Sequence, residues 1–461
     1  MGGPARWGTV AGCLALLLVA GGSIAQWRSS PSAPGPSAGS SPGAAPTTPS
    51  VPTVPAPVLA TLAAGREPTA AGVARALAGP LADPRLGRRV SATVVDVASG
   101  GVLLDRGAEA FAVPASVAKL ATAAALLSVV EPDLRLATTV LVGSRPGEVV
   151  LVGGGDPTLS AAPRGTPPAY PGAARLADLA AAARRAGAGK VTRVVVDGTL
   201  FTGPAMGPGW DPVDVTGGYV APITAVMLDA GRVGARRARS MQPDLDAGRA
   251  LAAALGSPGA QVVRGEAAPG VQQLAQVESA PVVRLVEQML LESDNVLAEA
   301  LARQVAIAVG APASFAGAVG AVRAALGQLG LPASGDGLVD GSGLSLRNAI
   351  TPALLAAIVR SAARPEHREL HALVPALPVS GYDGTLDARF RTGRSAPGAG
   401  EVRAKTGTLS GVSSLAGLVR GKDGRLLAFA VLADGIPAGG TLGAEDALDV
   451  VAATLATCTC R

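Results

Sequence analysis

One serine and one lysine give the first chemical signal in this chain. Lys and Arg together number 39 among the 461 residues, and only four of them are Lys. Lys119 lies three positions after Ser116, so on a helix the two side chains would share one face. A serine hydroxyl needs a neighbouring base to become a nucleophile, and a buried Lys can lose its proton whereas Arg cannot. The pair suits an acyl-enzyme, although taken alone it is explained equally well by a helix-capping Ser and a surface Lys.

A second motif, Ser293-Asp294-Asn295, falls between two predicted helices at 282–291 and 296–309. In such a loop the Ser293 hydroxyl could relay a proton to a leaving amine, and the Asn295 amide could hold a substrate carbonyl. Viewed by itself, the tripeptide is better explained as a helix cap.

A third motif, Lys405-Thr406-Gly407-Thr408, ends a predicted strand at 402–408. The Lys and the two hydroxyls could bind a terminal carboxylate, and the Gly would let a substrate backbone approach closely. The simpler explanation of this motif alone is a strand that runs into a turn.

The order of the three motifs favours the chemical interpretation. Ser-x-x-Lys, Ser-Asp-Asn and Lys-Thr-Gly follow one another on a helix, a loop and a strand, which is the set found in penicillin-binding proteins and class A β-lactamases. A Ser/His/Asp triad is disfavoured, because the only two histidines, His367 and His371, serve no nucleophile-elbow motif. They stand four apart on a predicted helix without a His-Glu-x-x-His pattern, so we expect no metal and no cofactor.

From about residue 75 to the C-terminus the chain resembles the D-alanyl-D-alanine carboxypeptidase/endopeptidase family, the class C low-molecular-mass penicillin-binding proteins of peptidase family S13. Besides the three motifs, the likeness rests on segments 154–159, 219–228 (which begins Tyr-x-x-Pro), 340–345 and 384–386. The resemblance implies an α+β fold: a β-lactamase/transpeptidase-like domain, in which an antiparallel sheet packs against helices, with an inserted smaller domain. Ser116 and Ser293 are 177 positions apart, which leaves room for one inserted module.

The resemblance also implies a role for each residue of the first two motifs. Ser116 would attack the penultimate D-Ala carbonyl of a peptidoglycan stem peptide while Lys119 takes its proton. Ser293 would pass a proton to the departing D-Ala, and Asn295 would hold the substrate amide.

For the third motif, the resemblance implies that Lys405, Thr406 and Thr408 bind the terminal carboxylate of the substrate, with Gly407 between them. The amides of Ser116 and Thr408 would form the oxyanion hole. β-Lactams would act as covalent inhibitors that trap Ser116 as a stable ester.

Two alternatives stay open beside a carboxypeptidase or endopeptidase. A serine β-lactamase of class A would carry a Glu-x-x-x-Asn loop between the second and third motifs, but none of Glu299, Glu366 and Glu369 has Asn four positions on. A catalytically silent cell-wall-binding protein would not need the intact motifs. One departure from the family pattern is Leu346, which stands before Arg347 where many relatives place Arg at once, and this leaves the stem-peptide side-chain preference open.

The chain ends and the composition indicate an exported protein with five segments. Residues 1–26, with Arg6 before an apolar run, predict a signal peptide or an uncleaved membrane anchor, and we interpret Cys13 as part of it rather than as a lipidation site. Residues 27–57 are rich in Pro, Ser and Ala and predict a disordered linker. We expect the transpeptidase-like domain at 58–136 and 276–461, the inserted domain at 137–275, and a location in the cell envelope, either secreted or N-terminally anchored.

Charge and cysteines add two further expectations. A net charge of +5 with 2% aromatic residues does not favour nucleic-acid binding, and the run Arg236, Arg237, Arg239 predicts a solvated surface. Cys458 and Cys460 could pair with each other or stay free, but they cannot staple the body of the protein.

Hydrophobic periodicity and turn residues predict the elements. The predicted strands are 90–96, 102–105, 139–142, 149–152, 191–197, 402–408, 412–420 and 426–433. The predicted helices are 116–130, 173–186, 282–291, 296–309 and 445–456. From residue 198 to about residue 275, we expect Pro- and Gly-rich loops that alternate with short strands.

Overall fold

A computed structural model describes residues 65–234, 238–331 and 337–461. The signal or anchor, Cys13 and the linker predicted for residues 1–57 lie outside the described residues, as do Arg236 and Arg237. None of the helices in the described part is long and apolar enough to cross a membrane.

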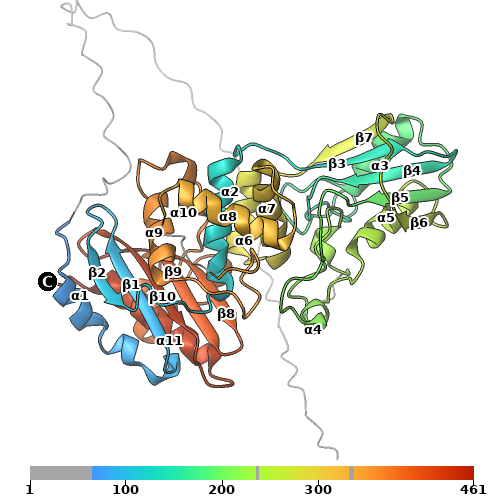
Figure 1. Ribbon diagram of the computed structural model, residues 1–461. Helices are drawn as coiled ribbons and strands as arrows, with labels where there is room; N and C mark the ends of the chain where they lie inside the picture. The colour runs from blue at the N-terminus through green and yellow to red at the C-terminus, as the bar shows by residue number, and fades with distance from the viewer. Residues whose placement is uncertain (1–64, 235–237, 332–336) are drawn as a thin grey trace, which may run out of the picture. The chain divides into compact units, whose positions relative to one another are not determined.

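The first sheet is antiparallel and has the strand order β2-β1-β10-β9-β8. The strands are β1 (Val90–Asp96), β2 (Val102–Arg106), β8 (Val402–Leu409), β9 (Val412–Arg420) and β10 (Leu426–Ala433). In Figure 1, the blue strands from the start of the folded chain lie beside the red strands from its end. The predicted hairpin and the predicted meander therefore join in one sheet, and β8, which carries the third motif, is an edge strand.

Both faces of this sheet are covered by helices. Along β10, Ala428, Ala430 and Leu432 belong to one buried cluster, while Leu427 and Phe429 belong to another, because successive side chains point to opposite faces. The first cluster contains residues of α2 (Lys119–Val129), α6 (Val282–Leu291), α7 (Asn295–Ala308), α8 (Phe315–Gln328), α9 (Pro352–Ala362) and α10 (Leu373–Ala376). The second contains residues of α1 (Ala70–Leu77) and α11 (Thr441–Thr457). Helix α2, which follows Ser116, is thus held deep in the larger core.

A second sheet forms between Ala137 and Glu278, with the order β6-β5-β4-β3-β7. Its strands are β3 (Ala137–Val142), β4 (Glu148–Gly153), β5 (Arg193–Asp197), β6 (Gln261–Arg264) and β7 (Gln273–Glu278). The pairs β4–β5 and β5–β6 are parallel and the others are antiparallel. With α3 (Leu176–Arg185) and α5 (Pro243–Ala254) this sheet has a buried cluster of its own. The α+β class predicted from the sequence is confirmed, while the domain boundaries at 137 and 275 stay a prediction.

Helix α5 was not predicted, because loops and short strands were expected in this part of the chain. Pro243 occupies the first turn, where its missing N–H costs nothing, and Asp244 and Asp246 complement the helix dipole there. Gly248 lies inside this helix, and because Gly has a low helix propensity the sequence did not predict a helix here. A Cβ at this position would lie 2.5 Å from a Val262 side-chain atom, so the Gly lets α5 lie close against the sheet. A second short helix, α4 (Pro212–Thr216), was missed in the same region.

The two histidines do not lie on a regular helix as predicted. His367 precedes a single 3₁₀ turn, Arg368–Leu370, and His371 follows it. His367 lies 3.1 Å from a Glu369 carboxylate oxygen, and His371 Nε2 lies 2.9 Å from the Arg364 carbonyl oxygen. Within the described residues, no group of three or more His, Cys, Asp or Glu side chains is placed to hold a metal ion.

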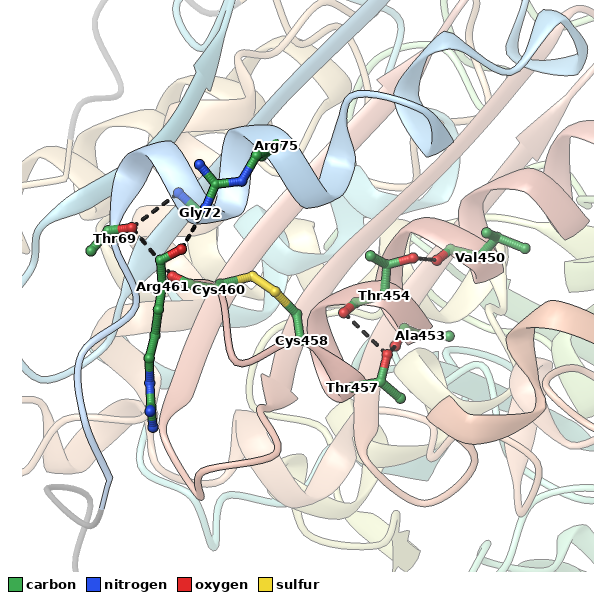
Figure 2. Close-up of a disulfide and its surroundings, with 10 residues drawn as sticks. All are labelled: Thr69, Gly72, Arg75, Val450, Ala453, Thr454, Thr457, Cys458, Cys460 and Arg461. Atoms are coloured by element: carbon green, nitrogen blue, oxygen red, sulfur yellow. Dashed lines mark hydrogen bonds between the residues drawn. A yellow bond between two sulfur atoms is a disulfide. The ribbon is translucent and has the colours of Figure 1, made fainter.

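The C-terminal segment docks onto α1, as Figure 2 shows. Cys458 and Cys460 form a disulfide directly after α11. The Cys460 carbonyl accepts a hydrogen bond of 2.8 Å from the Thr69 amide. A Cβ on Gly72 would lie 2.1 Å from the same carbonyl oxygen, so only Gly permits this approach. The first and last turns of the described chain are thereby tied together.

Candidate active site

Ser116 lies in a 3₁₀ turn, Ala115–Ala118, that leads directly into α2. Lys119 is the first residue of α2, its side chain is fully buried, and its Nζ donates a hydrogen bond of 2.9 Å to Ser116 Oγ. The amine also donates to Asn295 Oδ1 at 2.6 Å and to the Ser342 carbonyl at 2.7 Å. The structure therefore brings the first and second motifs together at one amine.

The environment of Lys119 makes its ammonium group easier to deprotonate than that of an exposed Lys. Burial lowers its pKa from 10.5 to about 8, although the carboxylates of Asp340, Asp294 and Glu299 act in the opposite direction. A pKa near 8 leaves a useful fraction of neutral base at mildly alkaline pH, whereas an exposed Lys would have almost none.

The Ser293–Asn295 loop is a tight connection between α6 and α7. Asp294 caps α7 by accepting a hydrogen bond of 3.0 Å from the Leu297 amide, which fits the capping role considered from the sequence. Ser293 has a left-handed backbone with φ of 56°, a conformation rare for a residue other than Gly. Asn295 donates through Nδ2 to the Tyr219 carbonyl at 3.0 Å while its Oδ1 faces Lys119. The loop is thus fixed between the Lys119 amine and the segment around Tyr219.

A cleft of about 490 Å³ opens above these groups. Its lining comes from all three motifs and from α4, the Asp340–Ser345 segment and α11: Ser116, Asp214, Tyr219, Ser293, Asn295, Leu344, Thr408, Leu409, Ser410 and Thr441. Sequence reasoning did not assign a role to Asp214, which is the one carboxylate among these lining residues. Its Oδ2 accepts from the Asp211 amide, so α4 holds it at the cleft wall.

The third motif contributes to this cleft less directly than predicted. Thr408 lines it, and its hydroxyl donates to Glu445 at 2.6 Å. Lys405 is fully buried, and its Nζ donates to the Thr406 carbonyl at 2.9 Å. Burial, reinforced by the neighbouring Lys119 and Arg389 charges, holds the pKa of Lys405 well below its usual value. Thr406 is also buried, with its hydroxyl 2.8 Å from that of Thr385.

Gly407 is required by the protein itself. A Cβ at this position would lie 2.2 Å from Ser414 Oγ, 2.6 Å from the Pro114 carbonyl oxygen and 3.0 Å from the Ser116 amide nitrogen. The sequence-based explanation, access for a substrate backbone, therefore needs extension: the Gly lets the edge strand β8 lie directly against the turn that carries Ser116.

The Asp340–Ser345 segment supports the amine from below, which sequence reasoning did not foresee. Ser342 supplies the carbonyl that accepts from Lys119, and its amide donates to Glu299 Oε1 at 2.8 Å. Glu299 is fully buried on α7; burial, with the neighbouring Asp340 carboxylate, raises its pKa to about 7. A Cβ on Gly343 would lie 1.9 Å from the Ala115 carbonyl oxygen, so the segment packs tightly against the Ser116 turn. In the sequence, only the Asp-Gly-Ser-Gly pattern indicated that this segment belongs to the site.

Arg239 corrects one prediction. Its run of basic residues was expected to be solvated, yet Arg239 is only 9% exposed and forms an ion pair with Asp294 at 3.3 Å. Arg232 pairs with the same carboxylate oxygen at 3.1 Å, and the Tyr170 hydroxyl donates to it at 2.6 Å. A buried carboxylate needs such partners, which explains why Arg239 lies in the interior.

Comparison with known proteins identifies the family of the chain. The family model described as the D-Ala-D-Ala carboxypeptidase 3 (S13) family matches residues 73–240 and 234–455. The chain belongs to this family. The resemblance inferred from the motifs is confirmed, and with it an enzyme of the carboxypeptidase class.

Relatives within the family cover most of the chain. A carboxypeptidase named DacB from Mycolicibacterium smegmatis is 47% identical over 404 residues, which is 85% of each chain. A carboxypeptidase from Mycobacterium tuberculosis is 44% identical over 416 residues, 88% of each chain. Penicillin binding protein 4 from Haemophilus influenzae matches the fold with a TM-score of 0.68 at 22% identity, over 82% of this chain and 97% of that chain. This structural match confirms the predicted transpeptidase-like fold.

Proposed function

We propose that this S13-family chain hydrolyses the D-Ala-D-Ala end of peptidoglycan stem peptides through an acyl-enzyme on Ser116. The observation that carries the proposal is the 2.9 Å hydrogen bond from a buried Lys119 amine to Ser116 Oγ, at the floor of the cleft that Ser293, Asn295 and Thr408 line. Carboxypeptidase and endopeptidase reactions share this acyl-enzyme, so the same groups serve both.

Acylation begins with the neutral form of Lys119. Ser116 Oγ attacks the carbonyl carbon of the penultimate D-Ala while its proton moves to Lys119 Nζ. The amides of Ser116 and Thr408 stabilise the oxyanion that forms, since both residues border the cleft. When the C–N bond breaks, the Ser293 hydroxyl donates a proton to the leaving amine and recovers one from Lys119, which returns the base to its neutral state. Water then hydrolyses the ester.

Substrate binding uses the second and third motifs. The Tyr219 backbone carbonyl accepts a hydrogen bond from one N–H of Asn295 Nδ2, and the second N–H can donate to a substrate carbonyl. The hydroxyl of Thr408, together with Lys405 and Thr406, receives the terminal carboxylate. Because a nearby anion raises the pKa of an amine, arrival of this carboxylate favours the charged form of Lys405, which burial disfavours.

β-Lactams present a strained amide in place of the D-Ala-D-Ala carbonyl and acylate the same serine. A penicillin binding protein 4 structure from Haemophilus influenzae, 22% identical to this chain with a TM-score of 0.59, is described in complex with a β-lactam. We expect slow deacylation here, because the only carboxylate among the lining residues, Asp214, already accepts from the α4 backbone and is not placed by any Glu-x-x-x-Asn loop.

An extracytoplasmic location completes the proposal. Peptidoglycan lies outside the cytoplasm, and the Cys458–Cys460 disulfide is of a kind that persists in oxidising compartments. Residues 1–26 would provide the export signal, either cleaved or retained as an anchor to the membrane.

Release of D-Ala from an acetylated L-Lys-D-Ala-D-Ala tripeptide tests this function. The full-length protein should release D-Ala, and the Ser116→Ala variant should not. A wild-type protein that is folded but releases no D-Ala would favour the silent wall-binding alternative, and rapid nitrocefin turnover would favour a β-lactamase.

A further inference from the structure

Asp294 stands between Ser293 and Asn295 in its loop, and its carboxylate contacts three side chains from elsewhere in the chain. It is 5% exposed, and its Oδ2 accepts hydrogen bonds from the Tyr170 hydroxyl and from the guanidinium groups of Arg232 and Arg239. Burial alone would raise the pKa of this carboxyl, but the two guanidinium charges hold it well below its usual range. The carboxylate is therefore ionised and fixes the position of its neighbours Ser293 and Asn295.

Arg239 differs from the other two partners because it also contacts the opposite wall of the cleft. Its Nε donates to the Gly218 carbonyl at 3.0 Å, directly beside Tyr219, whose own carbonyl accepts from Asn295. Its Nη1 donates to the Ala230 carbonyl at 2.7 Å. A closed ring of contacts thus runs from Asp294 through Arg239 to Gly218, and back from Tyr219 to Asn295.

The backbone that Arg239 contacts needs such support. Asp229 and Ala230 have φ values of 47° and 55°, two consecutive non-Gly residues in the left-handed region. Only a guanidinium offers three donors in a planar fork that can satisfy two carbonyls and a carboxylate together, whereas a Lys amine is a single point. Arg232 lacks the Gly218 contact, and its side chain is 35% exposed.

We propose that Arg239 is a positioning residue of the active site, which holds the Ser293–Asn295 loop and the Tyr219 wall at a fixed separation across the cleft. The proposal rests on the proposed function for its effect on turnover, but its structural part does not. Since misplacement of a reacting group by about 1 Å can cost about 100-fold in rate, loosening this ring should act mainly on kcat.

Three variants of the full-length protein separate positioning from simple stability. Arg239→Gln removes the charge and the fork, Arg239→Lys keeps the charge without the fork, and Tyr170→Phe removes a hydrogen bond to the same carboxylate without touching Gly218. The measurements are kcat and KM for D-Ala release, the rate constant of acylation by benzylpenicillin, and the Tm. Hydrogen exchange in the peptides covering 217–220 and 293–297 provides a readout that does not need activity.

We expect Arg239→Gln to lower kcat about 100-fold, and Arg239→Lys to recover most of the Tm while kcat stays at least about tenfold low with little change in KM. Tyr170→Phe should lower the Tm but leave kcat within about threefold of wild type. Both Arg239 variants should speed exchange in the two peptides together. If Arg239→Gln does not fold, the other two variants still decide.

Wild-type kcat and unchanged exchange in Arg239→Lys would overturn the proposal, as would a loss of kcat in Tyr170→Phe as large as in the Arg239 variants. A wild-type protein that neither releases D-Ala nor reacts with benzylpenicillin would instead refute the proposed function, and exchange in the two peptides would still test the role of Arg239.

Discussion

Lys119 is fully buried, and its Nζ lies within hydrogen-bonding distance of three oxygens, of Ser116, Asn295 and Ser342. An amine that donates to all three carries its full set of protons, so to act as the base it must first lose one and then accept the Ser116 hydroxyl hydrogen. The motif spacing predicted the first contact, whereas the sequence assigned Asn295 only to the substrate and did not predict the second. The third was not predictable, because it depends on a backbone carbonyl that no side-chain pattern reveals. At this scale the account rests on the balance between burial, which removes the proton, and nearby carboxylates, which retain it.

This balance predicts the pH dependence of acylation. Because only neutral Lys119 accepts the proton, kcat/KM should fall about tenfold per unit below a midpoint near pH 8 and reach a plateau above it. Stopped-flow measurement of benzylpenicillin acylation between pH 6 and pH 10 checks this profile. A rate independent of pH over this range would rule out Lys119 as the base.

Glu299 should shift that midpoint. Its pKa of about 7 leaves it ionised at pH 8, where its charge raises the pKa of Lys119. Glu299→Gln should therefore move the midpoint of the acylation profile to lower pH. Glu287→Gln, which removes a carboxylate paired with Arg284 on the surface, serves as the control and should leave the midpoint unchanged. A midpoint that stays in place or rises in Glu299→Gln would contradict the electrostatic account.

At the scale of elements, the site depends on how closely the edge strand β8 lies against the turn that carries Ser116. The strands β9 and β10 were predicted almost to the residue, because their long apolar and alternating runs leave few other possibilities. The helix α5 was missed, since Gly248 and its Pro-rich surroundings resemble a loop in sequence and only packing against the second sheet justifies them. The burial of Lys405 and Thr406 was also missed, because a strand-end motif does not reveal which of its residues face the cleft.

Gly407→Ala tests the approach of β8 to the Ser116 turn. The added methyl would meet Ser414 Oγ, the Pro114 carbonyl and the Ser116 amide, so β8 must move away. We expect a loss of about 1–3 kcal/mol in unfolding free energy and a fall of about 100-fold in the acylation rate. Gly421→Ala is the matched control, because its nearest neighbour there would be at an ordinary 3.5 Å. Wild-type acylation in Gly407→Ala would show that the close approach does not matter for catalysis.

At the scale of the whole chain, segments distant in sequence meet both at the site and where the described residues begin and end. The α+β class and the family followed from the sequence because three motifs occurred in a fixed order, even though each alone was weak. The charged interior around Asp294 did not follow, because the run that contains Arg239 is indistinguishable from a solvated surface until the carboxylate it meets is known. The docking of the C-terminal segment onto α1 was equally hidden, since Gly72 is one of 61 glycines.

The disulfide after α11 should contribute modestly to stability and little to activity. Cys458 and Cys460 are two positions apart, and so short a loop restricts the unfolded chain by about 1–2 kcal/mol. The double variant Cys458→Ser with Cys460→Ser should lower the Tm by a few degrees and keep wild-type kcat/KM. Reductant should lower the Tm of the wild type towards that of the variant, and leave the variant unaffected. A loss of activity without a loss of Tm would mean that this segment has a role in catalysis.

Intact-protein mass spectrometry after exposure to benzylpenicillin tests the central claim most directly, namely that Ser116 is the nucleophile and Lys119 its base. Wild type should gain the mass of one penicilloyl group, Ser116→Ala should gain none, and Lys119→Gln should gain it at least about 1,000-fold more slowly. Peptide mapping should locate the adduct on Ser116. An adduct of equal yield on folded Ser116→Ala, or on another residue of the wild type, would contradict the account.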